Sequence, residues 1–168
     1  MNSEQNVDSN EVEAAVQRYV ELREAVDAGD AHWSDFAELF TEDAVYVDPA
    51  WGRIEGLGEI RRLVFSDAMA GLEDWKFPLD FVMISGSIVV MKWRQEIPGA
   101  DGSVRTQSGV STLVYDGDGK FNYQEDLLNM VHVLEDLKAS QWRPAGGFHL
   151  PPAEPVRDFT PPKGYGQQ

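Results

Sequence analysis

The sequence contains no cysteine, few basic residues and no long apolar run. Without cysteine, the chain can form neither disulfides nor thiolate nucleophiles, and it cannot build cysteine-based zinc or iron–sulfur sites. Only 14 Lys and Arg residues stand against 29 Asp and Glu residues, and the net charge of −15 would repel phosphate backbones and anionic lipid surfaces. No apolar run approaches the roughly 18 residues of a membrane span, and the acidic start differs from a secretory signal. We therefore expect a cytoplasmic protein that binds neither nucleic acid nor membranes.

Several catalytic and cofactor motifs are also missing. The sequence contains no phosphate-binding loop, no G-x-G-x-x-G and no G-x-S-x-G. Its three histidines are scattered, and the spacing of His132 and Glu135 alone cannot make a metal site. We expect neither a metal nor a cofactor.

The residues that are present predict a single α+β domain. The composition, with 42% hydrophobic and 11% aromatic residues, is typical of a globular protein. Apolar residues recur at helical spacing over residues 8–29, 34–40 and 57–71, with Gly29 ending the first helix and Ser34 capping the second. A short strand ends at Asp48-Pro49 between the second and third helices.

From Trp75 onward the composition changes to that of strands. Segments 75–85, 87–97, 104–116 and 120–130 are rich in Val, Ile, Phe, Tyr and Trp, and turn sequences separate them. Pro78 places its strand at an edge or a bulge, because proline lacks an amide donor. The pattern leaves residues 130–140 open between a strand end and a short helix. Together these segments predict a cone-shaped, curved antiparallel sheet with three N-terminal helices on one face, enclosing a pocket.

The last part of the chain differs from the body. Six of the nine prolines lie after residue 140, together with apolar side chains such as Trp142, Phe148 and Phe159 that free linkers usually lack. We therefore divide the chain into a cone domain, residues 8–140, and a proline-rich extended tail, residues 141–168. The tail is expected to pack on the body or on a second subunit.

Side-chain alternation nominates polar clusters on three strands. In "VYVDP" Tyr46 and Asp48 share one face, and in "MKWRQEI" Arg94 and Glu96 share one face. In "FNYQED" either Asp126 or Glu125 can face inward, but not both. Carboxylates that meet inside an apolar pocket suit proton transfer, because burial and like charge raise one carboxyl pKa.

Structural interpretations stand beside these catalytic ones. Asp48 before a proline is also common turn chemistry, and Arg94 with Glu96 is more often a solvent-facing pair. Tyr19, on the apolar stripe of the first helix, is more often a core residue than a catalyst.

The stretch "VQRYVELREAVDAGDAHWSDFAELFTEDAVYVDPAWGRIEGLGEIRRLV" resembles the opening helices, first strand and third helix of SnoaL-like proteins in the nuclear transport factor two-like superfamily. The similarity covers about residues 11–137. It implies the cone fold and a homodimer. The superfamily includes isomerases, dehydratases, cyclases, epoxide hydrolases and non-catalytic modules, so the fold does not select a reaction.

Two kinds of member resemble this chain at specific positions. Steroid Δ-isomerases carry a helical Tyr, matched by Tyr19 in "RYVEL", and a general-base Asp before Pro, matched by Asp48. Their second hydrogen-bond donor corresponds to Ser111, where those enzymes have a protonated Asp. In limonene-epoxide hydrolases, Tyr-x-Asn, Arg-x-Asp and a later Asp correspond to Tyr46-x-Asp48, Arg94-x-Glu96 and Asp126.

Polyketide cyclases also resemble the chain at Asp126, where they keep an acid/base Asp. The resemblance therefore implies Asp48 and Asp126 as catalytic residues, with Arg94 and Glu96 orienting them. We expect Tyr19, Tyr46, Trp51 and Ser111 to bind the substrate, with Trp51 at the mouth of the pocket.

The leading hypothesis is a cofactor-independent enzyme that uses carboxylate acid/base catalysis on a small, apolar polyketide-, terpenoid- or steroid-like metabolite. The reaction is of the isomerase, cyclase or epoxide-hydrolase type. One alternative is a non-catalytic ligand-binding or dimerisation module, in which the polar groups only bind one another. Another is an interaction scaffold that uses the tail.

Overall fold

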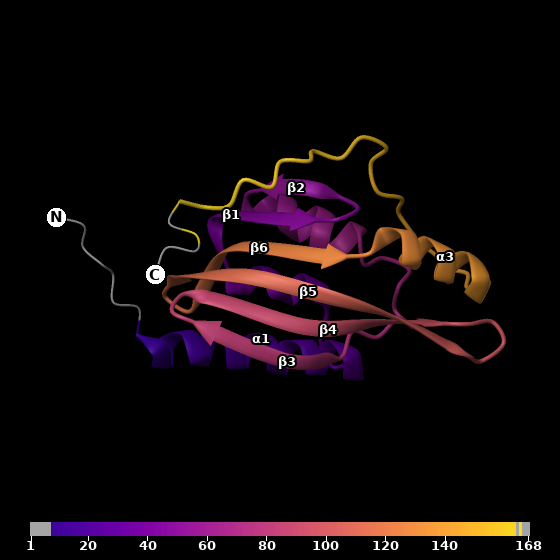
Figure 1. Ribbon diagram of the computed structural model, residues 1–168, viewed down its shortest axis with the longest axis horizontal. Helices are drawn as coiled ribbons and strands as arrows, with labels where there is room; N and C mark the ends of the chain where they lie inside the picture. The colour runs from indigo at the N-terminus through magenta and orange to yellow at the C-terminus, as the bar shows by residue number, and fades with distance from the viewer. Residues whose placement is uncertain (1–7, 164, 166–168) are drawn as a thin grey trace.

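A six-stranded, curved sheet that does not close forms the centre of the molecule, with helices on one face (Figure 1). The computed structural model describes residues 8–163 and 165. Its strands are β1 (Phe40–Asp48), β2 (Gly52–Glu55), β3 (Leu79–Ser85), β4 (Ile88–Pro98), β5 (Val104–Gly117) and β6 (Lys120–Leu128). Its helical elements are α1 (Ser9–Ala28), η1 (Trp33–Leu39), α2 (Leu57–Glu59), η2 (Ile60–Asp67) and α3 (Met130–Ser140). This architecture confirms the predicted α+β cone.

The strand order is β2-β1-β6-β5-β4-β3, so the predicted four-strand meander continues into the early strands. All neighbouring strands are antiparallel except β1 and β6, which run parallel. β3 is an edge strand, and Pro78 lies just before it, which fits the missing amide donor of proline.

The first helix begins and ends as its sequence predicts. Asp8 caps α1 by accepting a hydrogen bond from the Asn10 amide at 2.9 Å, and Gly29 ends it in the left-handed conformation, with φ of 85°. The buried side of the helix consists of Val12, Ala15, Val16, Tyr19 and Arg23.

The other two predicted N-terminal helices are shorter or wound differently. The second is a 3-10 helix that already begins at Trp33, so Ser34 lies inside it rather than capping it. The Asp35 carboxylate instead accepts from the backbone amide of His32 at 2.9 Å. The third begins as the single α-turn of α2 and continues as a π-helix over η2, which buries Ile60, Val64 and Phe65.

The end of the chain returns along the sheet. Residues 130–140, which the sequence left open, form α3, with Asn129 as its cap. The following segment runs beside β2 (Figure 1), where the Arg53 amide donates to the Val156 carbonyl at 2.8 Å.

A small apolar cluster lies apart from the main core, on the other face of the sheet. It contains Val47, Val114 and Tyr123, and the Tyr165 ring packs against Tyr123. Both faces of β1 are therefore covered.

The main core fills the space between the helices and the sheet. Its fully buried large side chains include Tyr19, Phe36, Phe40, Phe121 and Met91. Among residues 8–163 and 165, none of the helices has the length and apolar character that crossing a membrane requires.

Candidate functional site

A cavity of about 360 Å³ lies between the helices and the inner face of the sheet. Its walls are mainly apolar and include Trp33, Trp51, Trp75, Phe77 and Trp93. A few polar side chains interrupt this lining, among them two carboxylates. Such a cavity suits an apolar small molecule that a few polar groups hold in place.

Asp126, at the end of β6, is one of the two carboxylates and accepts three hydrogen bonds. Its Oδ2 accepts from the Tyr46 hydroxyl at 2.5 Å. Its Oδ1 accepts from the Ser111 hydroxyl at 2.6 Å and from the Gln124 amide at 2.9 Å. Tyr46 and Ser111 lie on the neighbouring strands β1 and β5, and Gln124 lies two residues before Asp126 on β6 itself.

The direction of these bonds is fixed by groups that can only donate. The Trp93 indole donates to the Ser111 hydroxyl at 2.8 Å, and the Gln124 amide nitrogen donates to the Tyr46 hydroxyl at 2.8 Å. The hydroxyl groups of Ser111 and Tyr46 must then each donate a hydrogen bond to Asp126. A carboxylate, which only accepts, satisfies every donor of this network.

Asp48, the second carboxylate, lies where β1 ends and has different partners. Its Oδ1 accepts from the backbone amides of Ala50 and Trp51, each at 2.7 Å, so it does hold the turn after β1. In the described residues, all hydrogen bonds to Asp48 go to this one oxygen, which leaves Oδ2 available to a ligand. Burial raises the pKa of Asp48 to about 6, and the nearby charge of Asp126 adds to the rise.

Two tyrosine hydroxyls of the pocket remain protonated donors. Burial, with the nearby Asp126, raises the pKa of Tyr46 well above its ordinary value. Burial likewise raises the pKa of Tyr19 to about 12, although the positive charge of Arg23 partly lowers it. The Tyr19 hydroxyl donates to the Gln124 side-chain oxygen at 3.1 Å, which joins α1 to the Asp126 network.

The structure brings most of the nominated residues together. Asp48, Asp126, Tyr19, Tyr46 and Trp51 line the cavity. Ser111 lies behind Asp126 and is 1% exposed. Of the two candidates on the last strand, Asp126 faces the cavity, while Glu125 accepts from the Tyr123 hydroxyl on the other face.

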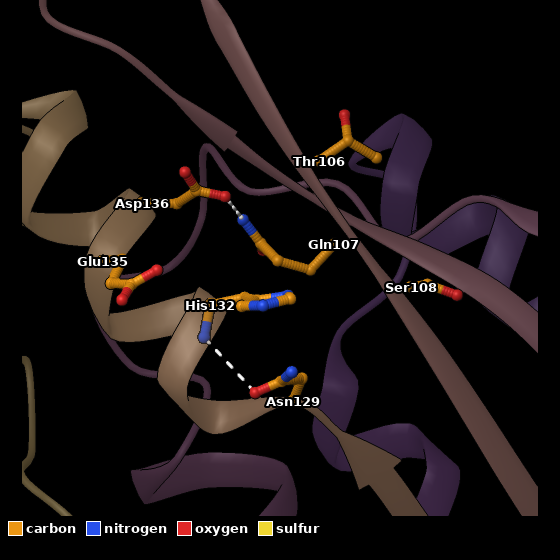
Figure 2. A pocket seen from close by; sticks show the side chains of 7 residues that line it. All are labelled: Thr106, Gln107, Ser108, Asn129, His132, Glu135 and Asp136. Carbon is orange, nitrogen blue, oxygen red and sulfur yellow. Dashed lines mark hydrogen bonds between the residues drawn. The ribbon is translucent and has the colours of Figure 1, made fainter.

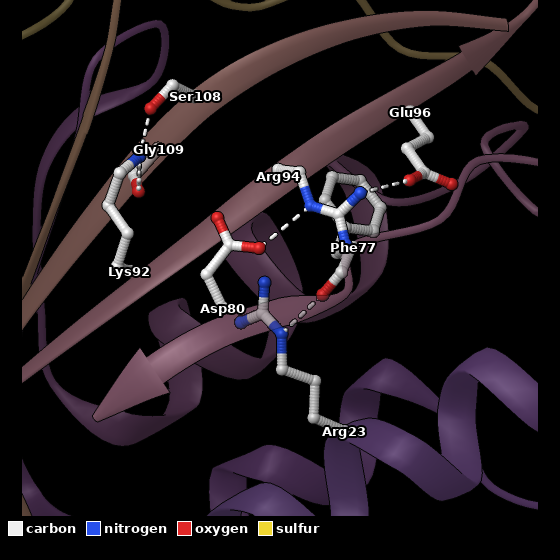
Figure 3. Close-up of polar contacts among 8 residues, drawn as sticks. All are labelled: Arg23, Phe77, Asp80, Lys92, Arg94, Glu96, Ser108 and Gly109. Carbon is white, nitrogen blue, oxygen red and sulfur yellow. Dashed lines mark hydrogen bonds and ion pairs between the residues drawn. The ribbon is translucent and has the colours of Figure 1, made fainter.

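Arg94 and Glu96 are a correction, because they lie on the outer face of β4. Arg94 donates to Asp80 at 2.8 Å and to Glu96 at 3.2 Å, and all three side chains are partly exposed (Figure 3). The inward residues of the strand are Trp93 and Gln95, because neighbouring side chains alternate. The two predicted orienting residues therefore form a solvent-facing pair.

Sequence reasoning missed Arg23, which is the cavity's buried cation. Its exposed fraction is 5%, and it lines the cavity from α1. A signal was available, because Val12, Val16, Tyr19 and Arg23 recur at helical spacing on the buried stripe. Strand alternation places Gln124 on the same face as Asp126, but its link to Tyr46 depends on the pairing of β1 with β6.

A second, more polar hollow of about 320 Å³ lies between β5 and α3 (Figure 2). It contains His132 and Glu135, and the Gln107 amide donates to Asp136 at 2.7 Å. Within the described ranges, no three His, Asp or Glu side chains are grouped so that they could hold a metal ion. The hollow lacks the apolar walls of the main cavity.

Comparison with solved structures gives the same fold at low sequence identity. A protein from Jannaschia sp. CCS1, described as a SnoaL-like polyketide cyclase, has 16% identity and a TM-score of 0.60 over 86% of this chain and 99% of its own. TerC, crystallised with polyporic acid, has 17% identity and a TM-score of 0.58 over 74% of this chain and 98% of its own. An LEH-like epoxide hydrolase of M. tuberculosis has 16% identity and a TM-score of 0.55 over 79% of this chain and 92% of its own. A search of curated protein sequences finds no match.

The family assignment rests on the sequence as well as on the fold. The model of the SnoaL-like domain matches residues 16–123, which is more than half of the chain. This range includes the second part of α1, the strand that carries Tyr46 and Asp48, and most of the meander. The chain therefore belongs to the family of SnoaL-like domains.

Proposed function

We propose that the protein is a cofactor-independent enzyme that moves a proton on a small, largely apolar metabolite. The observation that carries this proposal is Asp48, a carboxylate whose pKa lies near 6 at the edge of an apolar cavity. A general base works best when its pKa lies close to the working pH, because it is then both ionised and able to accept a proton. Asp48 meets both requirements at neutral pH.

The proposed reaction is proton abstraction next to a carbonyl group. The free Oδ2 of Asp48 takes the proton from carbon, which leaves an enolate, and the Asp48 acid then returns the proton elsewhere on the ligand or on its product. Asp126 acts as an anchor in this scheme. Its three donors hold its carboxylate in place, and its charge adds to the rise in the pKa of Asp48 that burial causes.

This assignment favours an isomerase or a cyclase over an epoxide hydrolase. In the epoxide-hydrolase arrangement an Arg bridges two acidic groups, and the matching residue here, Arg94, faces solvent. The fold is also shared with solved proteins described as a polyketide cyclase and as an epoxide hydrolase, which supports a small-molecule enzyme without selecting one reaction.

One observation favours the alternative of a non-catalytic binding module. Every hydrogen-bonding group around Asp126 already has a partner within the protein, as it would in a purely structural network. A binding module would use the aromatic walls to hold a ligand and would leave it unchanged.

Turnover of a compound panel separates these two functions. Purified protein is incubated with ketones, epoxides and polyketide-like aromatics, and conversion is followed by mass spectrometry and by solvent deuterium exchange at carbon. Asp48→Asn is the matched control, because an Asn oxygen can still accept from Ala50 and Trp51. We expect conversion by the natural protein and a loss of about 10²-fold or more in the variant. Binding without conversion would assign the protein to the non-catalytic class.

A further inference from the structure

Arg23 is buried in the wall of the cavity without an acidic partner. Its exposed fraction is 5%, and in the part of the chain that the structure describes no Asp or Glu forms an ion pair with it. The other arginine of this region, Arg94, has two carboxylates around it (Figure 3). A buried charge without a counter-ion is costly, so the position of Arg23 requires an explanation.

The surroundings of Arg23 hold its guanidinium in one orientation. Its Nε donates to the Phe77 carbonyl at 2.8 Å (Figure 3). Its Cζ lies 5.1 Å from the centre of the Trp93 ring and 5.9 Å from that of Trp33, so two aromatic walls flank it. The group is therefore fixed before any ligand arrives, as is usual for residues that recognise an anion.

The two carboxylates of the cavity do not serve as its counter-ion. Asp126 is engaged by three uncharged donors, and Asp48 holds the turn after β1. Among the described residues neither carboxylate forms an ion pair with Arg23, so the charge of its guanidinium is left for an acidic group of a ligand.

We propose that Arg23 binds an acidic oxygen of the ligand, either a carboxylate or an ionised enol, so that the ligand is an apolar ring system with one acidic end. A guanidinium offers several N–H donors in one plane, which match the oxygens of such a group. The aromatic walls then cover the apolar rings. This inference specifies the ligand class of the proposed function and rests on the same cavity.

Binding of two matched ligand pairs tests the proposal without requiring turnover. The pairs are 2-naphthoate with 2-naphthamide, and 2-hydroxy-1,4-naphthoquinone with 1,4-naphthoquinone, titrated calorimetrically at pH 7.5. The chain has no cysteine that could react with the quinones. We expect the acidic member of at least one pair to bind about thirtyfold or more tightly than its neutral partner. The pair that shows this preference distinguishes a carboxylate from an enol.

Two variants of Arg23 separate ligand binding from a structural role. Arg23→Met keeps much of the side-chain volume without the charge, and it should reduce the preference to about threefold or less while the protein stays folded, although the hydrogen bond to the Phe77 carbonyl is lost. Arg23→Lys keeps the charge and should retain part of the preference. Equal binding of acidic and neutral members, no binding of any of the four, or an unchanged preference in Arg23→Met would overturn the proposal.

Failure of this inference can be distinguished from failure of the proposed enzyme. Asp48→Asn should bind the acidic ligands at least as well as the natural protein, because it removes a negative charge from the cavity. If the protein prefers acidic ligands through Arg23 but converts none of them, it is a module that binds acids and not an enzyme. If turnover depends on Asp48 but acidic ligands are not preferred, the proposed enzyme is supported and the acidic ligand class is excluded.

Discussion

Asp48 and Asp126 have the same side chain, but the groups around them give them different roles. Asp126 accepts from two hydroxyls and one amide, all of which need an acceptor. Asp48 lines the cavity and accepts from two backbone amides through one oxygen, and in the described residues no hydrogen bond goes to its other oxygen. The two carboxylates should therefore respond in opposite ways when each is replaced by Asn.

Asp48→Asn should stabilise the fold at neutral pH. The pKa of Asp48 is about 6 in the folded protein, against an ordinary value of 3.8, so the folded state resists its charging. Stability due to this residue is highest below about pH 4, falls as the pH rises toward 6, and stays low above it. We expect Asp48→Asn to raise the free energy of unfolding by up to about 3 kcal/mol at pH 7.5 and by little at pH 4.

Urea unfolding at the two pH values measures this effect. The comparison needs no substrate, and the same variant should be inactive in the turnover panel. A gain in stability combined with a loss of activity is typical of a strained functional residue. A variant that is less stable than the natural protein at pH 7.5 would mean that Asp48 serves the turn alone.

Asp126→Asn should instead destabilise the protein. The amide nitrogen that replaces one carboxylate oxygen would meet a donor, either the Tyr46 hydroxyl or the Ser111 hydroxyl and Gln124 amide. An unsatisfied buried donor costs about 1–3 kcal/mol. Urea unfolding at pH 7.5 should show a loss of that size, and equal stability would contradict the directed network described above.

Arg94→Gln should have little effect on activity. Arg94 and its partners Asp80 and Glu96 lie on the exposed face of the sheet, where such pairs contribute at most about 1 kcal/mol. We expect kcat/KM within about twofold of the natural protein on any substrate from the panel. A loss of two orders of magnitude would show that Arg94 reaches the cavity after all.

Arg94 and Glu96, which were expected in the pocket, lie on a strand whose polar face points outward. Strand alternation correctly groups Arg94 with Glu96 and separates them from Trp93, but it does not say which group faces inward. The prediction assumed that the polar face of each of the three strands points into the pocket. This holds for β1 and β6 and fails for β4. The hydrophobic pattern offered an answer, since Met91, Trp93 and Ile97 all lie on the buried side.

At the scale of the elements, the segment after α3 lines the cavity and runs along the β2 edge of the sheet. Phe148, His149, Leu150 and Pro151 line the cavity. Further along, the Val156 carbonyl accepts from the Arg53 amide, and the Arg53 side chain donates to the Thr160 carbonyl at 2.9 Å. The tail is thus attached to β2 through backbone contacts that its composition could not predict.

Gly52→Ala should release this attachment. A Cβ at Gly52 would lie 2.6 Å from the Val156 carbonyl oxygen and 2.8 Å from its amide nitrogen. Backbone atoms on both sides leave no room, so the tail must move away from β2. Trypsin cleavage after Arg157 should become about tenfold faster or more, by analogy with other locally opened segments.

Gly56→Ala is the matched control for this change. Gly56 has nearly the same positive φ, 85° against 80° for Gly52, but its nearest contact to a new Cβ is 3.9 Å away, at Glu42. Both variants place an alanine at a positive φ that L residues rarely adopt, and only Gly52→Ala brings a Cβ against the tail. Equal cleavage rates in the two variants would mean that the tail does not depend on this contact.

The elements themselves were largely predictable, whereas their local winding was not. The ends of α1 follow from Asp8 and Gly29, and the four meander strands follow from turn sequences and β-branched residues. The 3-10 winding of η1 and the π-helical winding of η2 depend on how their apolar sides pack against the sheet. Tertiary packing decides such details, and a pattern of apolar residues does not contain it.

At the scale of the whole molecule, the cavity combines residues that are distant in the chain. Tyr19 and Gln124 are 105 residues apart, and Tyr46 and Asp126 are 80 apart, yet each pair is hydrogen-bonded. The contact between Tyr46 and Asp126 depends on the parallel pairing of β1 with β6, and the contact between Tyr19 and Gln124 depends on the packing of α1 against the sheet. The resemblance to SnoaL-like proteins predicted this convergence for Asp48 and Asp126, and it contained no position corresponding to Arg23.

The central claim is that Asp48 acts as the general base of this cavity, and the pH dependence of kcat/KM tests it most directly. On a substrate from the panel, kcat/KM should rise about tenfold per pH unit below 6 and level off above it, because the charged form of Asp48 is the active one. Asp126→Asn should shift this rise to lower pH, because the charge of Asp126 helps to raise the pKa of Asp48. A profile that is flat between pH 4 and 8, or one that persists unchanged in Asp48→Asn, would contradict the claim.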